Sequence, residues 1–307
     1  MSIILQANNI VKDYNNHKAL DNVSLNIPEG SIYGLMGPNG AGKTTLIRII
    51  NRITMPDSGE ILFNGRKLAP EDVLKIGYLP EERGLYKKMK VGEQALYLAR
   101  LKGLSRAEAL QRLKTWFKRF EILGWWDKKV EELSKGMAQK IQFIVTVIHH
   151  PTLMIFDEPF SGFDPINANL LKNEILDRAK EGATVIFSTH NMSSVEEICS
   201  HLTLINKSKN VLSGSVDDVR RSYGTNDYRL NFKGDTENVI NALSQFCTIE
   251  QSEAVKGLNS LVVIPKEGAS IRNIIEAANN SAEIHSFNEI IPSMNDIFIR
   301  AVENSSN

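Results

Sequence analysis

The sequence lacks several features that would tie it to a particular environment. Its two cysteines, Cys199 and Cys247, are too few for a disulfide framework, which is typical of a reducing cytoplasm. No apolar run approaches the ~20 residues that a membrane-spanning helix needs. No basic stretch followed by an apolar one opens the chain, so we expect no signal peptide. Composition also excludes collagen-like chains and long disorder.

The chain also lacks net charge, with 36 basic and 36 acidic residues. This balance argues against bulk nucleic-acid binding, and we expect no nucleic-acid partner. The distribution is nevertheless uneven. Residues 224–307 hold 6 basic and 11 acidic residues, whereas 83–140 hold 15 basic and 6 acidic ones. The basic region can either meet anionic lipid headgroups or acidic partner loops, or form an ordinary solvated helical face.

The composition is that of an ordinary globular protein, with 42% apolar and 23% charged residues. The length of 307 residues predicts about two domains. Apolar runs and period-two patterns predict strands at 3–5, 20–27, 31–36, 153–156 and 184–188. Periodicity of three to four residues predicts helices within 45–51, 83–150 and 169–180. Their alternation indicates an α/β fold with a largely parallel sheet. We expect Trp116, Trp125 and Trp126 to serve packing.

The pattern changes after Tyr223. Strands are predicted at 228–232, 248–251, 261–264 and 284–290, helices at 236–246 and 270–280, and one more helix at 292–302. The order βαββαβ predicts a small ferredoxin-like α+β domain. We therefore expect a domain at 1–223, containing a helical subdomain at about 83–150, and an accessory domain at 224–307, which we interpret as a dimer-stabilising or regulatory module.

A phosphate-binding motif follows the predicted strand at 31–36. The sequence Gly37-x-x-x-x-Gly42-Lys43-Thr44 matches the P-loop, or Walker A, pattern. Its glycines allow turns that aim backbone N–H groups at phosphate oxygens, and the helix that follows offers its positive end to the same anion. A plain glycine-rich turn is the alternative. The phosphate-binding candidates are Gly37, Pro38, Asn39, Gly40, Ala41, Gly42, Lys43, Thr44 and Thr45.

The P-loop motif predicts roles for its own polar residues and for two acidic residues elsewhere in the sequence. Lys43 should contact the β- and γ-phosphates, and the Thr44 hydroxyl should bind Mg²⁺. Asp157 and Glu158 end the apolar strand at 153–156. Asp157 can hold Mg²⁺ through water, and Glu158 can act as general base on an attacking water. Without the P-loop, the same pair would indicate only a solvated strand end.

Four further segments complete a resemblance to ATP-binding cassette (ABC) ATPases. The segment LSKGM at 133–137 resembles their signature, usually Leu-Ser-Gly-Gly-Gln, and SGFD at 161–164 resembles their D-loop. His190 stands where their switch histidine stands, and Tyr14 resembles the aromatic residue that stacks on adenine. Each residue also has a simpler interpretation when taken alone. Ser134 would be a helix N-cap, His190 a strand-end histidine and Tyr14 a half-buried aromatic residue of a strand.

The resemblance implies ATP and Mg²⁺ as cofactors and two cassettes that sandwich two ATP molecules. Ser134 and Gly136 would then contact a γ-phosphate held by the second copy of the chain, and Asp164 of the D-loop belongs to the same set. His190 would hydrogen-bond the γ-phosphate and act with Glu158 in catalysis.

Two departures from the family pattern bear on the rate of ATP hydrolysis. Lys135 and Met137 replace the usual Gly and Gln of the signature, although Ser134 and Gly136 are retained. Glu81 follows Gly-Tyr-Leu-Pro at the position where the family usually has the glutamine of its Q-loop. A carboxylate there can still bind Mg²⁺ or a bridging water, but it adds negative charge near the phosphates.

Three segments are similar to one subset of the family: GYLPEERGLY at 77–86, LSKGMAQ at 133–139 and IIPSMNDIF at 290–298. They resemble the ATP-binding subunits of ABC-2-type exporters, close to the sodium-efflux subunits. The resemblance implies a separate membrane-spanning permease, a second copy of this chain as partner and a peripheral location on the cytoplasmic side of the cell membrane. The alternative is a non-transport regulatory or binding ATPase of ABC type, against which the retention of Glu158 and His190 argues.

Overall fold

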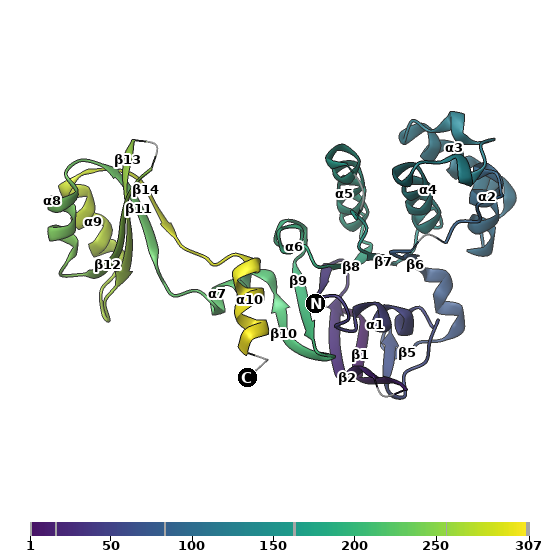
Figure 1. The fold of residues 1–307 in the computed structure, drawn as a ribbon, viewed down its shortest axis with the longest axis horizontal. Helices are drawn as coiled ribbons and strands as arrows, with labels where there is room; N and C mark the ends of the chain where they lie inside the picture. The colour runs from purple at the N-terminus through teal and green to yellow at the C-terminus, as the bar shows by residue number, and fades with distance from the viewer. Residues whose placement is uncertain (1, 16, 83, 162–163, 256, 305–307) are drawn as a thin grey trace. The chain divides into compact units, whose positions relative to one another are not determined.

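The computed structural model describes residues 2–15, 17–82, 84–161, 164–255 and 257–304. The chain divides into two compact units, one of Met1–Val216 with Phe298–Asn307 and one of Asp217–Ile297. Figure 1 labels most of their helices and strands.

The first unit is built on a six-stranded sheet with the order β10-β9-β3-β8-β7-β6. Its strands are β3 (Ile32–Met36), β6 (Ile76–Leu79), β7 (Leu153–Asp157), β8 (Thr184–Thr189), β9 (His201–Asn206) and β10 (Lys209–Ser215). All neighbours pair in parallel except β10, which is antiparallel to β9. Every residue of β3, β7 and β8 is buried, as expected for parallel strands covered on both faces. The predicted α/β fold with a largely parallel sheet is confirmed.

A second, antiparallel sheet has the order β2-β1-β4-β5, and the sequence did not predict it as a separate sheet. Its strands are β1 (Ile3–Tyr14), β2 (His17–Pro28), β4 (Ser58–Phe63) and β5 (Arg66–Lys67). Strand β1 is much longer than the predicted strand at 3–5. Register shifts and a positive φ at Asn9 interrupt the apolar alternation from which the rest of the strand could have been predicted. Helix α1 (Lys43–Ile50) packs in one core with this sheet and with the six-stranded sheet.

Three helices form most of the region predicted as a helical subdomain: α2 (Val91–Leu101), α3 (Arg106–Arg119) and α4 (Lys135–Val147). Their aromatic side chains pack in a row in which Trp116 contacts Phe143, and Phe143 stacks on Phe156 of β7. Trp116 is 6% exposed, so its predicted packing role is confirmed. Short 3₁₀ helices occur at Pro70–Lys75, Leu123–Trp125 and Val130–Glu132.

Helix α5 (Pro165–Lys180) begins four residues before the predicted start at 169. The Asp164 carboxylate accepts hydrogen bonds from the backbone N–H groups of Ile166 and Asn167, at 3.1 Å each, and Pro165 occupies the first helical position. Helix α6 (Met192–Ile198) follows β8.

The second unit contains a four-stranded antiparallel sheet of order β12-β13-β11-β14. Along the chain the elements are β11 (Tyr228–Lys233), α8 (Thr236–Leu243), β12 (Cys247–Val255), β13 (Leu258–Pro265), α9 (Ile271–Ser281) and β14 (Glu283–Glu289). This is the predicted βαββαβ order, so the ferredoxin-like prediction is confirmed. Helices α7 (Val216–Ser222) and α10 (Met294–Asn304) flank it in the sequence. No helix among the described residues is long and apolar enough to cross a membrane.

The packing of Gly92 in α2 gives a stability prediction. An ideal Cβ at Gly92 would lie 2.3 Å from Cδ2 and Cε2 of the Trp126 ring, although Gly92 has no positive φ. We expect Gly92→Ala to destabilise the cassette unit by about 1–3 kcal/mol through overpacking. Urea unfolding followed by tryptophan fluorescence measures the change.

Gly124→Ala is the matched control, because a Cβ there would meet nothing within 4 Å and φ is not positive. Equal unfolding midpoints for the two variants would contradict the contact between Gly92 and Trp126.

Candidate functional site

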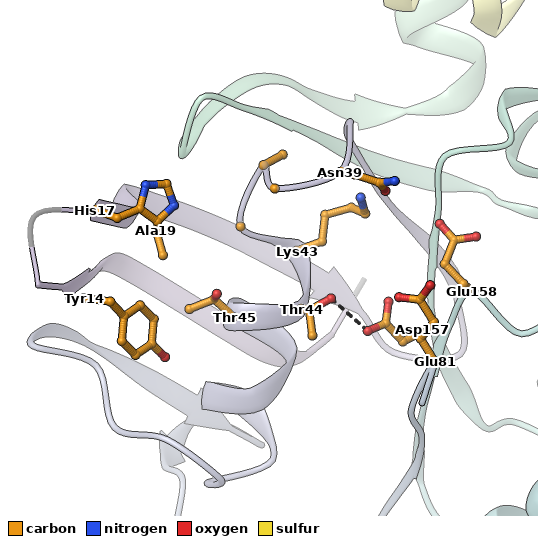
Figure 2. A pocket seen from close by; sticks show the side chains of 13 residues that line it. Tyr14, His17, Ala19, Asn39, Lys43, Thr44, Thr45, Glu81, Asp157 and Glu158 are labelled. Atoms are coloured by element: carbon orange, nitrogen blue, oxygen red, sulfur yellow. Dashed lines mark hydrogen bonds between the residues drawn. The ribbon is translucent and has the colours of Figure 1, made fainter. Parts of the chain in front are cut away.

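A cavity of about 350 Å³ lies where the carboxyl ends of the parallel strands meet the P-loop (Figure 2). Strands β6 and β7 pair so that Leu79 lies opposite Phe156, which brings the residues after both strands to one edge of the sheet. The cavity is lined by Tyr14, His17, Ala19, Asn39, Gly40, Ala41, Gly42, Lys43, Thr44, Thr45, Glu81, Asp157 and Glu158.

The P-loop backbone takes conformations that require glycine at its two ends. Gly37 and Gly42 have φ of 148° and 113°, and a Cβ would lie 2.1 Å from the Ile205 carbonyl oxygen in the first case and 2.4 Å from that of Ala19 in the second. Gly42 is the N-cap of α1, so the first turn of that helix points its free N–H groups at the loop. This arrangement is suited to an anion.

Lys43, the first residue of α1, places a cation in the cavity. Its side chain is buried, and Nζ donates hydrogen bonds to the carbonyl oxygens of Gly37, at 2.7 Å, and Pro38, at 3.1 Å. Burial lowers the pKa of Lys43, while the charges of Glu158, Asp157 and Glu81 oppose that shift. Figure 2 shows the Lys43 side chain between the P-loop and the carboxylates.

Asp157, at the end of β7, is 2% exposed and accepts a hydrogen bond at 3.0 Å from the Thr44 hydroxyl to its Oδ2. Burial raises the pKa of Asp157, because desolvation penalises the carboxylate more than Thr44 and Lys43 stabilise it. A divalent cation would supply the missing stabilisation, and these oxygen donors suit Mg²⁺. Glu81 lines the same cavity. Within the described chain no group of three or more His, Cys, Asp or Glu residues is placed to hold a metal, so phosphate oxygens would have to complete the coordination.

Glu158 is held in a strained conformation beside His190. Its φ of 48° lies in the left-handed region, which costs a non-glycine residue about 1–3 kcal/mol and occurs often at functional sites. Oε1 accepts a hydrogen bond from the backbone N–H of His190 at 2.9 Å and lies 2.7 Å from His190 Nδ1. The predicted pair therefore lies together, and His190 contacts Glu158 instead of lining the cavity.

The signature residues lie away from this cavity. Ser134 is the N-cap of α4, and its Oγ accepts a hydrogen bond from the Met137 N–H at 3.3 Å. This agrees with the simpler interpretation of Ser134, that of a helix N-cap. Ser134 and Lys135 are exposed, and a Cβ at Gly136 would meet nothing within 4 Å. A hydroxyl that accepts one hydrogen bond can still donate another, so this helix end is free to meet a second molecule.

The D-loop segment is described only in part. Asp164 is exposed and caps α5, and its contacts with Asn167 lower its pKa. It does not line the cavity, although the sequence placed it among the cofactor-binding residues. Gly162 and Phe163 lie outside the described residues.

Two lining residues, His17 and Ala19, were missed by the sequence analysis. Both lie at the start of β2, where His17 pairs with Tyr14 across the hairpin. Their only signal in the sequence is their closeness to Tyr14, because no motif includes them.

The fold, the P-loop and the two carboxylates define a P-loop nucleoside triphosphatase. Comparison with known proteins narrows this class. Residues 20–161 match the family described as ABC transporter, and residues 214–302 match the family described as ATP-binding protein DrrA1-3-like, C-terminal domain.

One relative shows the same family over almost the whole chain, and others show it over about 70% of the chain. The uncharacterized ABC transporter ATP-binding protein YhaQ of Bacillus subtilis (strain 168) is 41% identical over 299 residues, which is 97% of this chain and 98% of YhaQ. The Nod factor export ATP-binding protein I of Cupriavidus metallidurans is 32% identical over 222 residues, 71% of this chain and 73% of that protein. A solved structure of the ATP-binding subunit of an ABC transporter superimposes with a TM-score of 0.67 and 31% identity, covering 72% of this chain and 93% of that one. The chain belongs to the ATP-binding proteins of ABC transporters and is an ABC-type ATPase.

The buried charge of Asp157 gives a prediction about stability and pH. A carboxyl whose pKa is raised by folding destabilises the native state once pH exceeds the unfolded pKa of about 3.9. Asp157→Asn removes that charge, so we expect the ligand-free variant to melt at a higher temperature than the parent at pH 7. The difference should shrink as pH falls toward 4. Thermal unfolding between pH 4 and pH 8 measures it.

Asp127→Asn is the control, because the Asp127 side chain is 82% exposed and its charge costs little desolvation. An Asp157→Asn variant that melts at the same or a lower temperature than the parent at pH 7 would show that the Asp157 charge is not destabilising.

Proposed function

We propose that this chain is the ATP-binding and ATP-hydrolysing subunit of an ABC-2-type exporter, peripheral on the cytoplasmic side of the membrane. Two copies would close on ATP and drive a separate membrane-spanning permease. The observation that carries the proposal is the position of two adjacent residues after β6. Glu81 lines the nucleotide cavity, and Pro80 lines a second, mainly apolar cavity.

Several polar residues in or beside the nucleotide cavity have a step in hydrolysis that their position supports. The P-loop N–H groups and Lys43 bind and orient the phosphates. Thr44 and Asp157 would hold Mg²⁺, which neutralises charge on the phosphates when it is bound. Glu158 accepts the proton of the attacking water. His190, in contact with Glu158 Oε1, orients that carboxylate and can reach toward the γ-phosphate.

The position of the signature supports a requirement for a second copy. Ser134, Lys135 and Gly136 form the N-terminal end of α4, and none of them lines the cavity of their own chain. In a pair of copies this end can offer the Ser134 hydroxyl and helix N–H groups to a phosphate held by the other chain. Lys135 adds a positive charge there.

The second cavity, of about 420 Å³, supports a membrane partner. Several of its apolar side chains are strongly exposed, among them Ile53 at 61%, Leu74 at 49% and Leu101 at 57%. We propose that an apolar helical segment of the permease docks here. The full lining is Asn51, Ile53, Val73, Leu74, Tyr78, Pro80, Gly84, Leu85, Leu98, Leu101, Lys102, Gln142, Val145 and Thr146.

Polar contacts tie this docking cavity to the nucleotide site. The Thr146 hydroxyl is shared between the carbonyl oxygens of Gln142, at 2.8 Å, and Tyr78, at 3.3 Å, and Gln142 Nε2 donates to that of Glu82 at 3.3 Å. Lys102 Nζ donates to the carbonyl oxygens of Val73 and Ile76 at 2.9 Å each. The backbone on both sides of Glu81 is therefore held by residues that line the docking cavity.

The transported substrate is a separate question, because the permease would hold the translocation path. The likeness to a Nod factor export ATP-binding protein supports export. Sodium efflux rests on the sequence resemblance alone and stays a prediction, as does a dimer-stabilising or regulatory role for the C-terminal unit.

The hydrolysis step is tested by Glu158→Gln. Because an amide cannot accept the water proton, we expect turnover to fall by about 100-fold or more. ATP binding should persist, so the variant should accumulate as an ATP-bound dimer. Phosphate release and size-exclusion chromatography with ATP measure the two effects.

Glu181→Gln is the control, because the Glu181 side chain is 58% exposed and pairs with Arg178 on another part of the surface. If Glu158→Gln hydrolysed ATP at the parent rate, the hydrolysing role would be lost, and the non-transport regulatory alternative would be favoured.

The docking cavity is tested by Leu101→Gln. A polar amide in an apolar contact lowers affinity because it must be desolvated. We expect the membrane-bound fraction of the chain in its native cells to fall several-fold, while ATP hydrolysis by the purified variant is unchanged. Leu123→Gln, whose parent side chain is 54% exposed outside this cavity, should keep the parent distribution. Equal membrane binding by both variants would argue against docking at this cavity.

A further inference from the structure

The nucleotide cavity has an end that the phosphate-binding residues do not reach. Figure 2 shows Tyr14, His17 and Ala19 at one end of the cavity and Glu81, Asp157 and Glu158 at the other. Tyr14 ends β1 and is 43% exposed, and its backbone pairs with that of His17 at the start of β2. If the phosphates bind at the P-loop, the base of the nucleotide falls at the hairpin end.

One face of the Tyr14 ring is already occupied. Lys12 Nζ lies over the ring at 5.3 Å from its centroid, within the range of a cation–π interaction. The Lys12 side chain is only 14% exposed, so the charge is partly withdrawn from water and its attraction to the ring is strengthened. An aromatic ring has two faces, and a cation on one leaves the other as the face on which a base can stack.

Lys12 is itself held in place by Asp57, which precedes β4. Lys12 Nζ donates a hydrogen bond to Asp57 Oδ1 at 2.7 Å, and the backbone N–H of Asp13 donates to Asp57 Oδ2 at 2.7 Å. The Asp57 N–H in turn donates to the Val11 carbonyl oxygen at 2.8 Å. The hydrogen bond from Lys12 and that from Asp13 lower the pKa of Asp57, so the carboxylate stays ionised at neutral pH. Three contacts thus fix the ammonium relative to the backbone of β1.

We propose that Lys12 is a positioning residue for recognition of the nucleobase. Anchored by Asp57, it holds the plane of the Tyr14 ring so that the free face receives the adenine of ATP. It also draws ring electron density toward itself, which makes the free face a better stacking partner for an electron-rich purine. The inference rests on the proposed nucleotide site. Lys12 does not line the cavity, so its effect would pass through Tyr14 alone.

The test compares ATP with inorganic tripolyphosphate, which carries the phosphates without a base. In the full-length Lys12→Met variant we expect the KM for ATP to rise about 5-fold while kcat is unchanged. The inhibition constant of tripolyphosphate against ATP hydrolysis should not change. Lys12→Arg keeps a cation that can reach both Asp57 and the ring, so it should retain the parent KM. Lys18→Met, on the same hairpin but paired with Asp21, is the matched control and should behave as the parent.

A double-mutant cycle separates positioning from a general effect on folding. Tyr14→Ala should weaken ATP by about 5- to 150-fold through loss of stacking. Adding Lys12→Met to Tyr14→Ala should then change nothing further, because no ring remains to be positioned. Additive losses, or an equal loss of tripolyphosphate affinity, would overturn the proposal for Lys12. If the parent chain bound neither ATP nor tripolyphosphate, the nucleotide site itself would be wrong.

Discussion

Parallel pairing of β3, β8, β7 and β6 is the constraint on which the rest of the molecule depends. Parallel strands end at one edge of a sheet, so the P-loop after β3, Glu81 after β6 and Asp157 at the end of β7 converge without being close in the sequence. Strands β3, β7 and β8 are mainly apolar because both of their faces are covered, and the polar residues of β7 and β8 lie at the strand ends. The same burial that stabilises the sheet raises the pKa of Asp157, and that unfavourable charge is what suits the edge to a cation.

The elements that could be predicted from the sequence are those in which apolar side chains form an unbroken run or recur with a single regular period. Buried strands such as β7 and β8 are continuous apolar runs, and the C-terminal βαββαβ unit alternates cleanly between periods of two and 3.6. The P-loop was recognisable because its chemistry fixes residue types at fixed spacing. The length of β1 was not predictable, because bulges interrupt its alternation. Contacts made by pairing of distant segments also left no local signal: Lys12 meets Asp57 across 45 residues, and no motif includes His17.

Part of the positive charge at 83–140 forms ion pairs within the cassette unit. Two arginines of the basic region at 83–140 have internal partners: Arg112 pairs with Glu108, and Arg119 pairs with Glu174 and Asp177 of α5. Arg119 also lies over the Trp116 ring, with Arg178 of α5 on the same ring system. Arg119 and Arg178 connect α3 to α5, so part of the positive charge stabilises the contact between these helices. The exposed lysines of the region, such as Lys135 at the start of α4, are the ones left for contact with other molecules.

Pro80 and Glu81 are neighbours in the chain but border different cavities, one apolar and one charged. The link between the cavities therefore runs through the peptide backbone at the end of β6 and just after it, where Thr146 contacts the Tyr78 carbonyl oxygen and Gln142 that of Glu82. A backbone link does not depend on the identity of the side chains that face the partner. In the proposed assembly, residues such as Leu74 and Leu101 would therefore be able to differ between subunits that serve different permeases while the hydrolytic residues stay the same. Partner choice and ATP chemistry would then be separable traits, and pairing such a subunit with a foreign permease would become an engineering route.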